Sequence, residues 1–240
     1  AGKHLEGKYN TKKLTLFDYH VYCLCGDGDL MEGVSYEALS LAGTLKLNKL
    51  IVLYDSNDVC LDGKTSSTFT ENIAMRFVSM GWNVISVTDG ENYEAISKAI
   101  EEAHTSTDKP TLIEIKTTIG KYSALQGTNA VHGAPLTKED ITNIKEKLKV
   151  RDIPFIVSQN VFDDFRYLIE SRCNNLVNDF NEKLSSLSEK EQKELEYFMN
   201  EDKAITLKEL IYEPPTDKTE EAVRITSSKL LNSIVPSFPY

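Results

Sequence analysis

The sequence predicts an α/β protein: a doubly wound parallel sheet with helices on both faces, followed by a C-terminal helical extension. Three observations predict this fold. Short apolar runs alternate with helical patterns, the pattern repeats about every 30 residues, and charged helical patterns take over after residue 137. A repeat of about 30 residues is the length of one right-handed β-α-β crossover. With 40% hydrophobic residues, the 240-residue chain is expected to build a core.

Four apolar runs predict the strands of this sheet, at residues 19–25, 49–54, 83–88 and 111–117. Each run is nearly continuous rather than alternating, which is typical of strands buried on both faces.

Helical patterns lie between the predicted strands. They cover residues 31–45, the segment from Thr70 as N-cap to a stop at Gly81, and residues 92–104. The resulting order, β-α-β-α-β-α-β, predicts a parallel sheet.

The remainder of the chain changes character. Residues 120–135 carry three glycines and a proline with little periodicity, so we expect a long loop, and long loops in compact domains are often functional. Helical, highly charged patterns follow at 141–150, 161–187 and 188–199. Pro214 and Pro215 open a predicted linker to a last helix, Ala222 to Ile234.

Composition limits the classes of partner. The formal net charge of -10 argues against a nucleic-acid-binding surface. No apolar run is long enough for a membrane span and the first residues lack a signal peptide, so we expect a soluble, cytoplasmic protein. The four cysteines form no CxxC motif and are expected to be buried thiols rather than zinc ligands or disulfides.

The first predicted strand ends in Gly26-Asp27-Gly28. Asp-Gly is an ordinary turn, and the chain has two more of them. The alternative is a diphosphate site, in which Asp27 binds a divalent cation and the two glycines let phosphate approach the backbone. A helix expected to begin at about Leu30 would add free N–H groups beside the anion.

Asn57 favours the second interpretation. It follows the next predicted strand, 30 residues after Asp27, and one crossover returns the chain to the same edge of the sheet. Its carboxamide oxygen suits the same cation. Val59 could add its backbone carbonyl, for which the side chain does not matter.

These residues carry a resemblance to a known family. Gly-Asp-Gly followed about 30 residues later by Asn resembles the thiamine-diphosphate signature, and GDGDLMEGVSYEALSLAGTLKLNKLIVLYDSND is similar to transketolases. The resemblance continues through TENIAMRFVSMGWNVI, KPTLIEIKTTIG and VHGAPLTKED, and more weakly through RITSSKLLNSIVPSFP. It covers nearly the whole chain and implies the diphosphate-binding, N-terminal domain of a transketolase with the thiamine-diphosphate-binding fold.

The resemblance implies a role for each matching residue. Asp27 and Asn57 would bind Mg²⁺ (or Ca²⁺) through their side chains and Val59 through its carbonyl. Gly26, Gly28 and Asn57 would contact the diphosphate of the cofactor.

Two further residues match family positions near the reaction. His132 would lie near the diphosphate and the reacting end of the sugar, although a lone histidine is more often an ordinary surface residue. Glu32 would belong to a carboxylate network at a homodimer interface that links two active sites. Without the resemblance, Glu32 would be interpreted as a first-turn residue that favours the helix dipole.

The implied function is transfer of a two-carbon ketol unit from a ketose phosphate to an aldose phosphate in the pentose phosphate pathway. The expected domains are a diphosphate-binding domain truncated at its N-terminus (1–150), its helical extension (151–213), and a linker with the start of a pyrimidine-binding domain (214–240). Without the rest of that second domain, the isolated chain is expected to be inactive.

Two alternatives remain open. One is another thiamine-diphosphate enzyme, such as deoxyxylulose-phosphate or dihydroxyacetone synthase. The other is a non-catalytic binding or dimerisation module.

Overall fold

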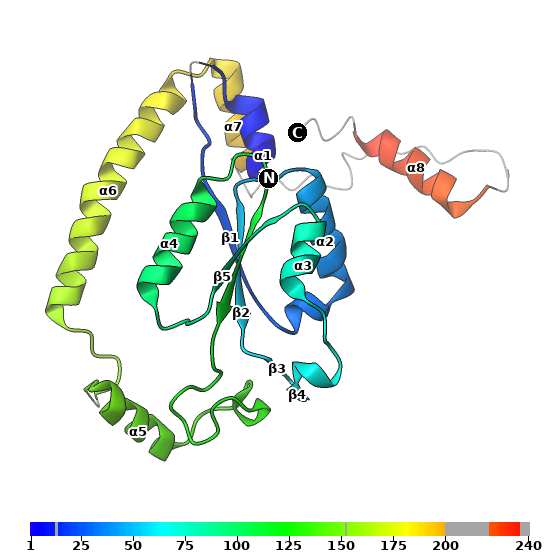
Figure 1. Cartoon of the computed structure of the whole chain (residues 1–240). Helices are drawn as coiled ribbons and strands as arrows, with labels where there is room; N and C mark the ends of the chain where they lie inside the picture. The colour runs from blue at the N-terminus through cyan, green and yellow to red at the C-terminus, as the bar shows by residue number, and fades with distance from the viewer. Residues whose placement is uncertain (13, 152, 200–220, 236–240) are drawn as a thin grey trace. The chain divides into compact units, whose positions relative to one another are not determined.

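The computed structural model describes residues 1–12, 14–151, 153–199 and 221–235 (Figure 1). The chain divides into two compact units, Ala1–Phe165 and Arg166–Tyr240. The predicted linker at Pro214 and Pro215 lies outside the described residues.

The first unit is built on a four-stranded parallel sheet, which confirms the predicted fold class. Its strands are β1 (Val21–Gly26), β2 (Leu50–Ser56), β5 (Asn83–Val87) and β6 (Thr111–Lys116), in the order β1-β2-β6-β5. Gly26 of β1 pairs with Asp55 of β2, and Ser56 pairs with Lys116 of β6. The carboxyl ends of three neighbouring strands therefore reach the same edge of the sheet.

Helices cover both faces of the sheet, as predicted. Helices α2 (Gly33–Thr44) and α3 (Ile73–Ser79) lie on one side of the sheet in Figure 1, and α4 (Tyr93–His104) lies on the other. Each side has its own core of buried residues. The core beneath α2 and α3 contains Leu30, Leu39, Ala42, Val52, Tyr54, Ile73, Phe77, Trp82 and Leu112. The core beneath α4 contains Ile51, Val87, Ala99, Ala103 and Ile113.

The prediction of burial on both faces is wrong for the first strand. Val21 and Tyr22 of β1 are exposed, and Leu24 is 75% exposed. The main described contacts of β1 are with β2 and η1, whereas the other edge strand, β5, also packs against α3 and α4.

The prediction of buried thiols also fails. All four cysteines are free, as expected, but Cys23 on β1 and Cys173 are exposed, while Cys25 and Cys60 are only partly buried.

Two helix starts also differ from the sequence prediction. Residues Asp29–Met31 form a short 3₁₀ turn (η1), so α2 begins at Gly33 rather than near Leu30. Helix α3 is capped by Asn72, whose side-chain oxygen accepts from the N–H of Met75 at 2.9 Å, and not by Thr70. Asparagine binds the free N–H groups of a first turn at least as well as threonine does.

Shorter elements complete the first unit. They are α1 (Gly2–Tyr9), the antiparallel pair β3 (Val59–Cys60) and β4 (Gly63–Lys64), the 3₁₀ turns η2 (Thr65–Ser67) and η3 (Asn129–Val131), and α5 (Lys138–Leu148). The segment from 117 to 137 is the long loop that the sequence predicts, with η3 inside it.

The C-terminal part is helical, as predicted. Helix α6 (Gln159–Ser185) begins in the first unit and continues into the second, which also contains α7 (Glu189–Met199) and α8 (Val223–Ile234). No residue of α6 is buried within the described part of the chain. None of the described helices is both long enough and apolar enough to cross a membrane.

Candidate cation and diphosphate site

Asp27 and Asn57 lie in direct contact at the carboxyl edge of the sheet. Asp27 follows β1 and Asn57 follows β2, and the backbone N–H of Asn57 donates to Oδ2 of Asp27 at 3.0 Å. The N–H of Asp58 donates to the same oxygen, also at 3.0 Å. The structure therefore places the backbone of Asn57 against the Asp27 carboxylate, and the role of the two side chains as cation ligands stays a prediction.

The carboxylate of Asp27 is buried, with only 4% of the residue exposed. Its second oxygen, Oδ1, accepts a hydrogen bond from the hydroxyl of Tyr54 at 2.5 Å. Burial, followed by this hydrogen bond, raises the pKa of Tyr54 above its ordinary value, while a hydrogen bond with Ser56 lowers it. The hydroxyl is therefore protonated at neutral pH and acts as a donor.

The carboxamide of Asn57 is held by its neighbours in the turn. Its Oδ1 accepts from the N–H of Val59 at 3.0 Å, and its Nδ2 donates to Asp55 at 3.4 Å. The hydroxyl of Thr117, just after β6, donates to the other oxygen of Asp55. The amide is thus oriented, and a carboxamide oxygen with two lone pairs still has one free for a cation.

The donor set suits a hard divalent cation. A carboxylate, a carboxamide oxygen and a backbone carbonyl are the oxygen ligands that Mg²⁺ and Ca²⁺ take. No group of three or more His, Cys, Asp or Glu side chains among the described residues forms an alternative metal centre. The predicted site contains a single carboxylate, that of Asp27, and is not a group of this kind.

The fold itself does not require glycine on either side of Asp27. A Cβ added at Gly28 would meet no atom within 4 Å, and one added at Gly26 would meet only Asp29 at 3.9 Å. Gly28 has φ -62° and ψ -38°, a conformation open to any residue. Close approach of a ligand to the backbone is a physical reason for glycine at these positions.

The second carboxylate of the turn has a local role. Oδ2 of Asp29 accepts from the N–H of Gly26 at 2.8 Å, and the carbonyl of Asp29 accepts from the hydroxyl of Ser35 at 2.6 Å. Asp29 therefore closes the turn and ties it to α2.

Glu32 is the N-cap residue of α2, but its side chain makes no capping hydrogen bond. Its side chain is exposed, which leaves the role implied by the family resemblance as a prediction.

His132 lies in the loop that follows β6, at the end of η3. Its backbone N–H donates to Asn129 at 3.0 Å and its side chain is exposed. Within the described residues, no hydrogen bond or ion pair joins its ring to Asp27 or Asn57. The topology brings the loop to the same edge of the sheet, and the role of His132 stays a prediction.

The loop that carries His132 is anchored at both ends. Near its start, the Tyr122 hydroxyl and the Lys121 ammonium bind Glu91, at 2.6 and 2.5 Å. Further along, Asp140 accepts from the N–H of Ala124 at 2.8 Å and from the Thr137 hydroxyl at 2.6 Å. These bonds hold the pKa of the Asp140 carboxyl below its usual value. These contacts hold the two ends of the loop that carries His132.

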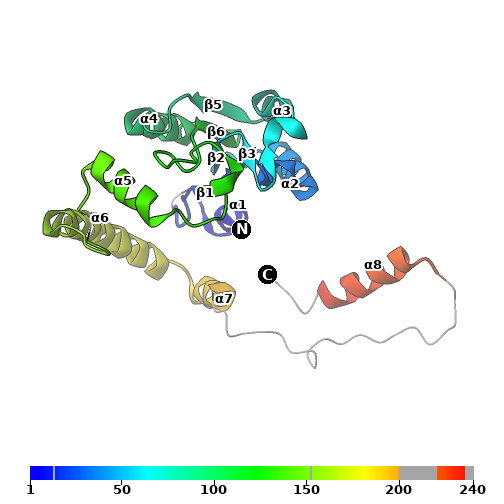
Figure 2. The ribbon, with the colours of Figure 1, turned by 90° about the horizontal axis from the view of Figure 1, so that it is seen from below.

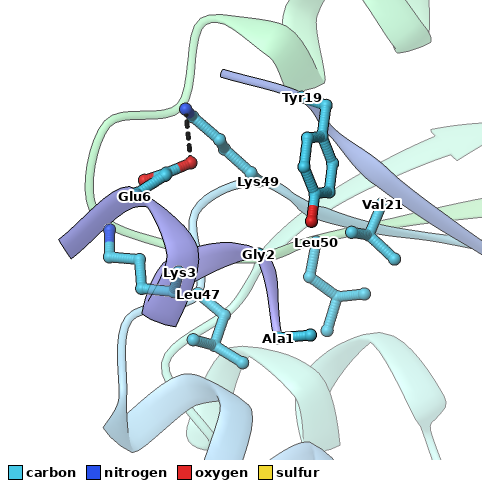
Figure 3. Close-up of a pocket in the computed structure, with 9 residues that line it drawn as sticks. All are labelled: Ala1, Gly2, Lys3, Glu6, Tyr19, Val21, Leu47, Lys49 and Leu50. Atoms are coloured by element: carbon cyan, nitrogen blue, oxygen red, sulfur yellow. Dashed lines mark hydrogen bonds and ion pairs between the residues drawn. The ribbon is translucent and has the colours of Figure 1, made fainter. Parts of the chain in front are cut away.

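Of two hollows on the first unit, one is lined by a predicted site residue and the other is not. One, of 420 Å³, lies beside Asp27 and Tyr54, and Lys116 and the first residues of α3 also line it. The other, of 190 Å³, is shown in Figure 3 and lies near the start of β2, where Glu6 of α1 pairs with Lys49 at 2.6 Å. None of the predicted site residues lines the second hollow.

Sequence reasoning missed Tyr54, which it treated as part of an apolar strand. The signal that identifies it is its place in LIVLYDS, where it is the first side chain with a polar group after four aliphatic residues, near the end of the strand. A buried tyrosine hydroxyl normally has a hydrogen-bond partner. Here that partner is Asp27.

Comparison with known proteins identifies related sequences. Residues 1–204 match the family model described as "Transketolase, thiamine diphosphate binding domain". The transketolase of Bacillus subtilis (strain 168) is 39% identical over 244 residues, covering 100% of this chain and 37% of that protein. The transketolase of Geobacillus stearothermophilus is 48% identical over 175 residues, covering 71% of this chain and 26% of that protein. The chain thus spans 26% to 37% of the length of these relatives.

Comparison with solved structures also finds transketolases. A transketolase mutant from Pichia stipitis has a TM-score of 0.81 and 35% identity, and covers 97% of this chain and 35% of that one. The transketolase from Leishmania mexicana has a TM-score of 0.73 and 45% identity, over 76% of this chain and 27% of that one.

Proposed function

Because this chain belongs to the family of the transketolase thiamine diphosphate binding domain, we propose that it holds the diphosphate end of thiamine diphosphate through a divalent cation. The cation is Mg²⁺ or Ca²⁺, bound by Asp27, Asn57 and the carbonyl of Val59. Gly26, Gly28 and Asn57 contact the diphosphate. The whole protein transfers a two-carbon ketol unit between sugar phosphates, in the cytoplasm and as a homodimer, and residues 214–240 lead into its pyrimidine-binding domain.

The observation that carries the proposal is the contact between Asp27 and Asn57, flanked by two glycines that the fold does not require. The Asp27 carboxylate and the net charge of -10 both repel a diphosphate, and a divalent cation between them offsets that repulsion. The turn supplies hard oxygen ligands for that cation and an open backbone for the phosphates.

The residues of this chain orient the cofactor and hold the cation that neutralises its diphosphate. They do not supply the bond-breaking chemistry. When bound, thiamine diphosphate acts as the electron sink for cleavage and transfer of the two-carbon unit. Asp27 and Asn57 anchor its diphosphate, which fixes the position of its reactive end. His132, on its anchored loop, donates a hydrogen bond to the sugar phosphate donor.

The reaction is tested by joining this chain to the complementary domains of a transketolase. We expect ketol transfer from xylulose 5-phosphate to ribose 5-phosphate, measured as the appearance of the longer ketose product. Turnover with pyruvate as the only effective donor would contradict the proposal and favour a deoxyxylulose-phosphate synthase. Cofactor binding without transfer from any donor would indicate a non-catalytic module.

A further inference from the structure

The hydrogen bonds of Asp27 leave one position on its carboxylate free. A carboxylate has about four lone-pair positions. Oδ2 accepts from two backbone N–H groups, those of Asn57 and Asp58, each at 3.0 Å. Oδ1 accepts from the Tyr54 hydroxyl at 2.5 Å. Among the described residues no other group binds this carboxylate, so one lone pair, on Oδ1, remains for a further partner.

The donor that takes the other lone pair of Oδ1 is rigidly placed. Tyr54 is only 3% exposed and belongs to the core beneath α2 and α3. It pairs with Cys25 of β1 on one side and with Glu114 of β6 on the other, so the sheet fixes its backbone. Its hydroxyl therefore reaches Oδ1 from a fixed direction.

We propose that Tyr54 is a positioning residue, which holds the Asp27 carboxylate so that Oδ1 is the single oxygen offered to a divalent cation. The inference rests on the proposed function, because it concerns the cation that binds the diphosphate. Tyr54 itself does not touch the cation. It acts through Asp27, by fixing which oxygen binds and in which direction its free lone pair points.

This role predicts an effect on the choice of cation. Mg²⁺ demands nearly ideal octahedral geometry, whereas Ca²⁺ accepts six to eight oxygen ligands in flexible arrangements, including bidentate carboxylates. Without the Tyr54 hydroxyl, the direction of Oδ1 is set only by the bonds to Oδ2. The loss of positioning should therefore weaken Mg²⁺ binding more than Ca²⁺ binding.

The test uses Tyr54→Phe, which removes one hydroxyl and keeps the ring in the core. Mg²⁺ and Ca²⁺ are each titrated calorimetrically into the 240-residue chain in the presence of thiamine diphosphate. Loss of a hydrogen bond to a metal ligand typically lowers metal affinity about 10- to 100-fold. We expect a fall of that size for Mg²⁺, a smaller fall for Ca²⁺, and a Mg²⁺/Ca²⁺ affinity ratio about tenfold lower than in the wild type.

A matched control is Tyr9→Phe, since Tyr9 is also buried, at 4% exposure, but lies in α1. This variant should leave the Mg²⁺/Ca²⁺ ratio at the wild-type value. Equal losses of affinity for both cations in Tyr54→Phe would show that Tyr54 has a merely structural role. No loss for either cation would show that Tyr54 has no role at the site. Either result overturns the proposal for Tyr54 and leaves the proposed function standing. A wild-type chain that binds neither cation overturns the proposed function as well.

Discussion

The backbone N–H of Asn57 donates to Oδ2 of Asp27 at 3.0 Å, so a hydrogen bond joins the ends of two neighbouring parallel strands. The bond uses the backbone of Asn57 and leaves its carboxamide pointing elsewhere, toward Val59 and Asp55. Main-chain N–H groups therefore hold Oδ2 of Asp27, and among the described residues one oxygen on each of the two side chains keeps a lone pair without a partner.

Gly28→Ala distinguishes an effect on ligand binding from an effect on the stability of the fold. Gly28 has helical dihedral angles and an added Cβ meets nothing within 4 Å, so alanine should leave the free energy of unfolding unchanged or raise it by about 0.4–1 kcal/mol. If phosphate approaches this backbone, the new methyl group should lower the affinity for thiamine diphosphate. Chemical denaturation and calorimetry measure the two quantities.

The control for this variant is Gly33→Ala, because a Cβ at Gly33 also meets nothing within 4 Å. Gly33 is the first residue of α2 and lies outside the Gly26–Gly28 turn. Its alanine variant should keep wild-type cofactor affinity. Equal affinity in both variants would mean that phosphate does not approach Gly28.

His132→Ala tests the role of the loop after β6. The side chain is exposed, so its removal should change the free energy of unfolding by no more than about 0.5 kcal/mol. In the chain joined to its complementary domains, loss of one hydrogen-bond donor at the reacting sugar should lower kcat/KM about 100-fold. Unchanged kcat/KM would remove His132 from the active site and leave it a surface residue.

The pH dependence of stability tests a histidine pair outside the site. The His20 ring stacks on His104 with 4.2 Å between centroids. Burial, then the charges of His104 and Lys49, lower the pKa of His20 from 6.5, against the smaller opposing effects of Asp18 and Glu6. The folded state therefore binds fewer protons than the unfolded state near pH 6, and stability is lost as pH falls below about 6.5.

His20→Gln should reduce this loss, because glutamine takes up no proton. Urea unfolding between about pH 5.5 and 8 measures it as the slope of unfolding free energy against pH. Parallel slopes for the variant and the wild type would show that His20 does not contribute.

Most of the sheet and its helices could be predicted from the sequence, because each crossover repeats the same apolar and helical patterns. The exposure of β1 could not, since Val21, Tyr22 and Leu24 look as apolar as the central strands. Which strand lies at the edge depends on pairing, and the strand order places β6 between β2 and β5. No local pattern records that order.

For the candidate site, spacing was sufficient to bring Asp27 and Asn57 together, because parallel strands end at one edge. The detailed hydrogen bonding was not predictable. The 3₁₀ turn at Asp29–Met31 depends on the bond from Gly26 to Asp29, and the contact of Tyr54 with Asp27 depends on register between strands. The first is a local bond that the sequence pattern does not single out, and the second is a tertiary contact whose partner the position of Tyr54 in its strand does not reveal.

The central claim is that a cation at Asp27 holds the diphosphate, and calorimetric titration of thiamine diphosphate into the chain tests it most directly. Wild-type chain should bind the cofactor with Mg²⁺ and lose binding when EDTA removes the cation. Asp27→Asn, which keeps an oxygen for hydrogen bonding but removes the charge, should bind markedly more weakly, and Asp27→Ala should not bind. Equal binding by the wild type and Asp27→Ala, or binding that persists in EDTA, would contradict the account.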